Sequence, residues 1–264
     1  KIYKKIKKMY KETESDSVII ALSPDILKKK IKEIFSFNSK YLIEKPVGLN
    51  LKDSNYIRKI SKEKKINAYV ALNRRYYTST RYLLKKIKYN KNVNRLVEIE
   101  DQQDQILNKA MFSKKILDNY MFVNSIHLID YFNLLCRGSL KKIIRVKKWQ
   151  SRKKNIFTSY LYFDSGDIGI YRAVWNMPGP WSVKIYLRNG YYKLSPLERI
   201  FFRKNYLRKD EIININYEND KKFKPGIKLQ LHDFLNVMNN KKNHLPSLDI
   251  SNKLMMMISK IYKK

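Results

Sequence analysis

The chain has 264 residues, with 57 Lys and Arg against 23 Asp and Glu, so its formal net charge is +34. Hydrophobic residues make up 44% of the sequence and aromatic residues 13%, which is enough for a packed core and excludes a wholly disordered chain. No apolar stretch is long enough to span a bilayer, and one cysteine with three histidines offers too few ligands for a structural zinc site. We therefore expect a folded, cytoplasmic protein with no membrane partner and no metal.

The positive charge is spread along the whole chain. Most of the basic residues are lysines, and they occur in nearly every segment together with isoleucine and asparagine. Nucleic-acid binding requires cations that gather on one face, where they neutralise phosphates. A general excess of lysine on solvated surfaces does not meet that requirement. We therefore predict no nucleic-acid partner, while a phosphorylated or acidic small substrate stays open.

The first part of the chain alternates short apolar runs with helical patterns. The run at residues 17–22 is β-branched and apolar and ends at a Ser23-Pro24-Asp25 turn, as expected for a buried parallel strand. Short connections in this order favour right-handed crossovers, so residues 1–90 are predicted to form a doubly wound parallel sheet with helices on both faces. Strands are predicted at 17–22, 40–44 and 67–72, and helices at 26–35, 53–64 and 77–88.

After residue 90 the apolar runs become longer, and several alternate with polar residues. This alternation and two glycine-containing turns predict an open antiparallel sheet over residues 91–264, with helices on one face. Strands are predicted at 95–103, 140–150, 156–163, 168–175 and 182–188, and helices at 124–136, 229–238 and 250–262.

Six segments taken in order carry a resemblance to a known family: VIIALSP, YLIEKPVG, VALNRRYY, NSIHLIDYFNLLCRG, VWNMPGPW and PGIKLQLHDFLNVM. Together they resemble the glucose-fructose oxidoreductase, inositol dehydrogenase and MocA (Gfo/Idh/MocA) family of NAD(P)-dependent oxidoreductases. The resemblance implies a partial dinucleotide-binding Rossmann domain, with an incomplete doubly wound sheet, over residues 1–90 and a substrate-binding and oligomerisation domain over 91–264. It also implies oxidation of a sugar or sugar-nucleotide hydroxyl, in carbohydrate or surface-polysaccharide metabolism, by a homodimer or homotetramer associated through the antiparallel sheet.

The Glu44-Lys45-Pro46 triplet ends a predicted parallel strand, where ligands of open α/β sheets bind. The resemblance implies that Lys45 lies beside nicotinamide and substrate, positions the substrate and relays a proton. The chemistry suits a lysine, because hydride leaves a carbinol carbon only if the hydroxyl proton also departs. An ammonium group also stabilises the developing alkoxide. A solvated lysine before a proline turn is the alternative.

His127 is the candidate base, because its segment resembles the histidine segment of the family. Many members of that family have an aspartate where this chain has Val123, so Asn124 or another group would orient the imidazole. Asn124 is also predicted to contact the substrate. A histidine on a helix is otherwise a packed, hydrogen-bonded residue, and that alternative stays open.

Further contacts follow from the same resemblance. The predicted substrate-binding residues are Lys45, Asn124, His127 and Trp175, with Trp175 and Trp181 able to stack on a sugar face. Arg74 suits a phosphate or carboxylate, although a surface arginine and hydrophobic sheet tryptophans are the alternatives. The predicted cofactor-binding residues are Leu22, Ser23, Pro24, Glu44, Lys45, Pro46, Asn73 and Arg74.

A glycine-rich first turn normally holds the pyrophosphate of NAD or NADP, and none of the seven glycines forms a G-x-G-x-x-G pattern. We expect that the first βαβ unit, about 30 residues or more, is encoded upstream of Lys1, and that residues 1–264 alone bind NAD(P) poorly. A catalytically impaired relative that binds a sugar or a protein is the alternative, which Val123 and the missing turn favour.

Overall fold

The computed structural model describes residues 1–88 and 93–263 and divides into two compact units. Unit 1 comprises residues 1–72 and 229–256, and unit 2 comprises residues 73–228 and 257–264. The predicted domain boundary at residue 90 lies outside the described residues and stays a prediction; of the described residues, 73–88 belong to unit 2 and 229–256 to unit 1. None of the described helices is both long and apolar enough to cross a membrane.

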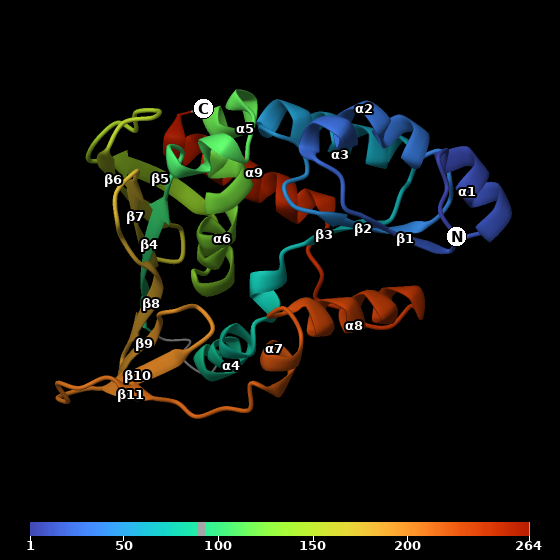
Figure 1. Ribbon diagram of the computed structural model, residues 1–264. Helices are drawn as coiled ribbons and strands as arrows, with labels where there is room; N and C mark the ends of the chain where they lie inside the picture. The colour runs from blue at the N-terminus through green and yellow to red at the C-terminus, as the bar shows by residue number, and fades with distance from the viewer. Residues whose placement is uncertain (89–92, 264) are drawn as a thin grey trace. The chain divides into compact units, whose positions relative to one another are not determined.

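Unit 1 is built on a parallel sheet, as predicted, and its strand order is β1-β2-β3. Figure 1 shows helices α2 and α3 on one face of this sheet and α8 on the opposite face. On the outer edge of β3, the N–H of Val70 donates to the carbonyl of Pro246 at 2.8 Å. The strands are β1 (Ser17–Ile20), β2 (Lys40–Glu44) and β3 (Ala68–Ala71), and the helices are α2 (Pro24–Ile34), α3 (Leu51–Glu63) and α8 (Ile227–Met238).

The core of unit 1 follows from the spacing of its apolar residues. Leu27, Ile31 and Ile34 lie on one side of α2 and are buried, as a helical repeat of three to four residues requires. Helix α3 starts at Leu51, earlier than predicted, because Asn50 is its N-cap and its side chain accepts a hydrogen bond from the N–H of Asp53 at 2.9 Å.

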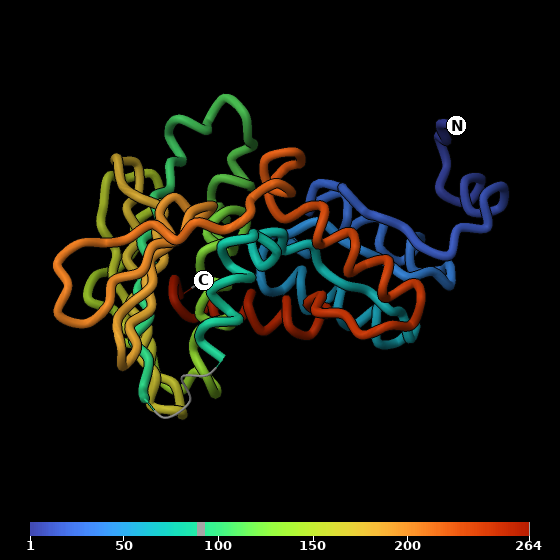
Figure 2. The backbone as a smooth tube through the Cα atoms, turned by 90° about the horizontal axis from the view of Figure 1, so that it is seen from below, coloured from blue at the N-terminus to red at the C-terminus, as the bar shows by residue number. Residues whose placement is uncertain are grey.

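A further helix, α1 (Ile6–Thr13), was not predicted and lies at one end of unit 1, next to the N-terminus (Figure 2). Its buried residue is Tyr10, whose ring stacks on Phe37 with centroids 3.8 Å apart. The hydroxyl of Tyr10 also donates to that of Tyr41 at 3.1 Å. A single aromatic anchor therefore attaches this lysine-rich helix.

Unit 2 is built on an eight-stranded sheet in the order β11-β10-β9-β8-β4-β7-β6-β5. It is mixed rather than antiparallel throughout, because the neighbouring strands β4 and β7 are parallel. A parallel pair needs a long crossover connection, and the segment that contains helix α6 (Ile126–Leu135) is part of it. The strands are β4 (Leu96–Gln103), β5 (Leu140–Arg145), β6 (Asn155–Phe163), β7 (Ile168–Trp175), β8 (Trp181–Leu187), β9 (Gly190–Leu194), β10 (Ile200–Lys204) and β11 (Glu211–Ile212).

Helix α6 packs against β4 and β8 and is followed by Cys136, a buried free thiol. The helix starts at Ile126 rather than at residue 124, because the preceding turn, η3 (Met121–Ser125), is a π-helix. The other helical segments of the described chain are η1 (Asn73–Tyr76), α4 (Thr78–Ile87), η2 (Leu107–Ala110), α5 (Lys114–Asp118), α7 (Glu218–Lys222) and α9 (Leu248–Tyr262), of which α9 contributes residues to both units.

Candidate functional site

The carboxyl edge of the parallel sheet carries the predicted residues of unit 1. The segment Leu22-Ser23-Pro24 follows β1, and Glu44-Lys45-Pro46 ends β2, so both lie at the edge where open α/β sheets bind ligands. Leu22, Ser23 and Glu44 are exposed, whereas Lys45 is half-buried and precedes Pro46 through a cis peptide bond. These six predicted residues therefore lie at one edge of one sheet.

The described residues at this edge form no cradle for a pyrophosphate. The first turn of α2 begins with Pro24, which has no N–H, and contains the carboxylate of Asp25, which disfavours an anion there. The ammonium of Lys28 lies 2.6 Å from the carboxylate of Asp53, so its charge is already compensated. Within residues 1–88 and 93–263, no glycine-rich turn leads from a parallel strand into a helix.

In unit 2, strand β4 places two polar side chains at core positions. Its buried residues alternate along the strand as Val97, Ile99, Asp101 and Gln103. Asp101 is 0% exposed and Gln103 is 1% exposed, so both side chains are removed from water. Buried polar groups need hydrogen-bond partners, and a pair of them in a strand otherwise suited to the core indicates a specific role.

A chain of hydrogen bonds links these two residues to Asn124. The hydroxyl of Tyr171 donates to Oδ2 of Asp101 at 2.6 Å, and Nε2 of Gln103 donates to Oδ1. Oε1 of Gln103 then accepts a hydrogen bond from Nδ2 of Asn124 at 2.8 Å. Asn124 is half-buried and lies in the π-helical turn η3, so the chain leads from the core toward a more accessible side chain.

Burial raises the pKa of Asp101 to about 6, which is the largest effect on this carboxyl group. Hydrogen bonds from neighbours such as Tyr171 and Gln103, and the positive charge of Arg74, act in the opposite direction. The carboxyl group is therefore ionised at neutral pH, and it then accepts hydrogen bonds without donating any.

His127 is the second residue of α6 and is 7% exposed. Val123 lies in the preceding turn η3, which forms i→i+5 hydrogen bonds and therefore directs side chains differently from an α-helix. Single π turns occur often at functional sites. The prediction that Lys45 and His127 act on one hydroxyl stays a prediction, since the two residues belong to different units.

Arg74 lies in η1 with its guanidinium over the ring of Trp181, 4.6 Å from the ring centroid. Its Nε is buried and has no hydrogen-bond partner, and desolvation lowers the pKa of the guanidinium from its ordinary value. No carboxylate of the described residues forms an ion pair with it. Trp181 is directly opposite Asp101 in the β4–β8 pairing and is held by a 2.6 Å hydrogen bond from Nε1 to the carbonyl of Gln102. This arrangement suits an anionic ligand group.

Two other predicted residues of unit 2 make contacts that stabilise the fold. Asn73 donates through Nδ2 to the carbonyl of Pro225 at 3.1 Å. Trp175 is fully buried, with its ring edge against Trp149 at a centroid distance of 5.3 Å and against Tyr262 at 6.0 Å. This position is at odds with stacking on a sugar and favours the alternative of a core tryptophan.

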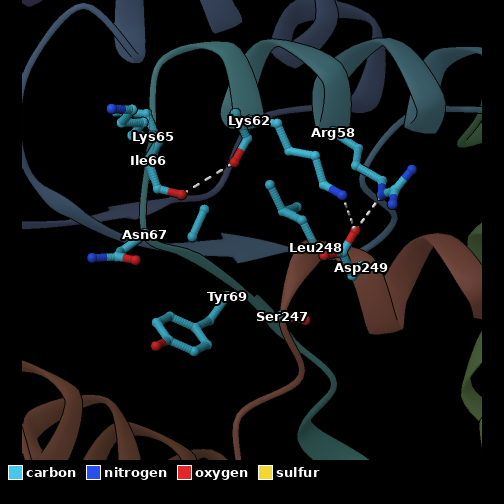
Figure 3. Close-up of a pocket in the computed structure, with 11 residues that line it drawn as sticks. Arg58, Lys62, Lys65, Ile66, Asn67, Tyr69, Ser247, Leu248 and Asp249 are labelled. Atoms are coloured by element: carbon cyan, nitrogen blue, oxygen red, sulfur yellow. Dashed lines mark hydrogen bonds and ion pairs between the residues drawn. The ribbon is translucent and has the colours of Figure 1, made fainter.

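A cavity of about 330 Å³ in unit 1 lies apart from the predicted residues, at the start of β3 (Figure 3). Figure 3 shows the side chains of Arg58 and Lys62 directed toward Asp249, which forms an ion pair with each of them, at 3.4 Å for Lys62. Because the cations of Arg58 and Lys62 are both already paired with Asp249, we assign no ligand to this cavity.

No protein-family model matches the sequence, and no curated protein matches it. The fold, however, is similar to those of many solved structures. UDP-N-acetylglucosamine 3-dehydrogenase GnnA from Acidithiobacillus ferrooxidans aligns with a TM-score of 0.77 at 15% identity, over 99% of this chain and 81% of that one. The WlbA dehydrogenase from Bordetella pertussis, in complex with NADH and UDP-GlcNAcA, aligns with a TM-score of 0.76 at 13% identity, over 99% and 80%. A dehydrogenase from Chromobacterium violaceum aligns with a TM-score of 0.79 at 14% identity, over 98% and 79%. The chain therefore has the fold of these dehydrogenases, a small parallel sheet followed by a large mixed sheet.

Proposed function

We propose that the chain acts as an NAD(P)-dependent oxidoreductase on a hydroxyl or carbonyl group of a sugar nucleotide. The observation that carries the proposal is the arrangement on the inner face of the unit 2 sheet. There, Arg74 is a cation with an unused buried donor, and Asn124 ends a fixed hydrogen-bond chain. A sugar nucleotide carries both phosphate or carboxylate anions and hydroxyl groups, so it offers partners to both residues. The fold shared with GnnA and WlbA supports this substrate class.

In the proposed reaction, NAD or NADP supplies the hydride acceptor or donor when it is bound. The residues of this chain handle the proton and the charge. We assign to His127 the removal of the hydroxyl proton and to Lys45 the positioning of that hydroxyl and the stabilisation of negative charge on its oxygen. Both assignments rest on the resemblance of their segments to the Gfo/Idh/MocA family.

A catalytically impaired relative that binds a sugar or a protein is the second candidate. The specific observation in its favour is the carboxyl edge of unit 1, where the described residues form no pyrophosphate cradle. Measuring cofactor reduction in the protein as its gene encodes it separates the two candidates.

Calorimetric titration of the chain with UDP-N-acetylglucosamine tests the substrate class directly, and we expect saturable binding. The Arg74→Met variant is expected to bind about 10-fold to 100-fold more weakly, because it loses a charge-assisted contact with the ligand anion. Arg81→Met is the matched control, since Arg81 also lies over an aromatic ring, that of Tyr76, at 5.9 Å. Absence of binding by the wild-type protein, or equal binding by both variants, would contradict the proposal.

We also propose that the outer face of the unit 2 sheet is a self-association surface. A row across this face consists of Tyr160, Ile170, Glu98 and Lys184, in directly opposite positions on β6, β7, β4 and β8. The wild-type chain should sediment as a dimer or tetramer, and Tyr160→Glu should shift it toward the monomer, because association would bury an unpaired charge. Tyr206→Glu, at a fully exposed position, should leave the mass unchanged. A wild-type monomer would refute this surface.

A further inference from the structure

We propose that Asp101 is a positioning residue: through Gln103 it fixes the amide of Asn124 with Oδ1 turned toward the ligand. In this orientation Asn124 accepts a hydrogen bond from a sugar hydroxyl or an acetamido N–H. The inference rests on the proposed function, since it assigns Asn124 to the sugar-nucleotide site. It adds to that function two residues, Asp101 and Gln103, that do not touch the ligand.

The orientation follows from donor and acceptor counting. An ionised carboxylate accepts hydrogen bonds only, and Oδ2 of Asp101 already receives one from Tyr171. Gln103 must therefore present its NH2 group to Oδ1 of Asp101. Its carbonyl Oε1 then faces Asn124, and only the NH2 group of Asn124 can donate to it. Oδ1 of Asn124 is then left as an acceptor for a ligand, together with the second N–H of Nδ2.

Burial makes the direction of these hydrogen bonds difficult to reverse. Asp101 and Gln103 are 0% and 1% exposed, so water cannot replace a lost partner of either side chain. Rotation of the Gln103 amide alone would bring two acceptors together at Asp101 and two donors together at Asn124, and unsatisfied buried groups are costly. The far end of the chain is also held, because the hydroxyls of Tyr171 and Tyr262 lie 2.7 Å apart. The charge of Asp101 thus determines which atom Asn124 presents.

The sequence has Val123 where many members of the Gfo/Idh/MocA family have an aspartate. Val123 cannot form a hydrogen bond through its side chain, whereas Asn124 in the same π-helical turn is fixed by a carboxylate two side chains away. The polarity of the site is therefore set from the core of the sheet, by a residue of β4, rather than from the helix that bears His127.

Moving the carboxylate from position 101 to position 124 tests the chain of hydrogen bonds. Asn124→Asp introduces a carboxylate that cannot donate to Oε1 of Gln103, so UDP-N-acetylglucosamine binding should weaken by about 10-fold or more. Adding Asp101→Asn lets the chain run in the opposite direction, with the new amide at 101 donating to Oε1 of Gln103 and Nε2 of Gln103 donating to the new carboxylate at 124. An acceptor still faces the ligand, so the double variant should bind within about 3-fold of wild type.

The matched control adds Asp104→Asn to Asn124→Asp. This change restores the same net charge, but Asp104 accepts hydrogen bonds from the backbone N–H groups of Ile106 and Leu107 rather than from the chain. It should give no rescue. Equal rescue by Asp104→Asn, or no rescue by Asp101→Asn, would overturn the positioning role.

Melting temperatures of the same variants without ligand provide a readout that does not depend on the substrate. Asn124→Asp should lower the melting temperature, and Asp101→Asn should recover part of the loss, although the two side chains are joined only through Gln103. If the wild-type protein binds the ligand but the changes in melting temperature of the single variants add up in the double variant, the hydrogen-bond chain is refuted and the proposed function stands. If the wild-type protein does not bind the ligand but the changes in melting temperature are not additive, the hydrogen-bond chain is supported and the sugar-nucleotide assignment is refuted.

Discussion

Replacing His127 with alanine is expected to lower turnover by about 100-fold to 10,000-fold, the usual cost of losing a positioned proton-transfer group. Lys45→Ala should lower turnover in the same range, because the substrate oxygen loses a stabilising charge. The measurement is the rate of cofactor reduction in the protein as its gene encodes it, with the thermal stability of each variant recorded in parallel. Because His127 is buried, His127→Ala also leaves a cavity that lowers stability, so the conservative His127→Gln variant should be measured as well.

His232→Ala is the matched control for the histidine variants, because His232 is exposed on α8. It should leave turnover unchanged. If His127→Gln folds stably and turns over at the wild-type rate, His127 is a packed helix residue and the non-catalytic alternative gains support. A structural histidine would instead lower stability while the folded fraction kept its normal turnover.

Asp130→Ala is expected to lower the free energy of unfolding by about 3–5 kcal/mol, because it leaves a buried cation without its partner. Arg75 donates two hydrogen bonds of 2.6 Å to the Asp130 carboxylate, and the two side chains are only 12% and 4% exposed. Burial lowers the pKa of Arg75, but the charge and hydrogen bond of Asp130 outweigh this effect and raise it overall. Urea unfolding provides the measurement.

Two controls sharpen this test. Glu63→Ala removes the exposed ion pair with Lys59, at 3.7 Å, and should cost less than about 0.5 kcal/mol. Combining Arg75→Met with Asp130→Leu removes both buried charges and should cost less than Asp130→Ala alone. A loss below about 1 kcal/mol for Asp130→Ala would show that this pair contributes little.

The strands of unit 1 could be predicted because β1 to β3 are continuous apolar runs bounded by turn residues. The strands β9 to β11 could not, because their side chains are mostly half-buried or exposed, which removes the alternation that indicates a strand. Helix α1 escaped prediction because only Tyr10 is buried among its lysines. The parallel pairing of β4 with β7 depends on contacts between distant segments, so no local pattern contains it.

In the candidate site, too, some residues could be predicted from the sequence and others could not. Lys45 and His127 could be selected from motifs, whereas Asp101 and Gln103 were missed. A signal for them exists, since VEIEDQQ places Val97, Ile99, Asp101 and Gln103 on one face, but one strand alone does not show whether that face is buried. The π-helical turn before His127 has no recognisable composition, so it could not be predicted from the sequence.

The chemistry of the single cysteine has a practical consequence. Cys136 is buried at the end of α6, and burial raises the pKa of its thiol, so very little thiolate is present at neutral pH. Maleimide and iodoacetamide reagents react with the thiolate and should therefore leave the native protein unmodified. A Glu63→Cys substitution on the exposed side of α3 would then accept a fluorophore or spin label selectively, with Cys136 left in place.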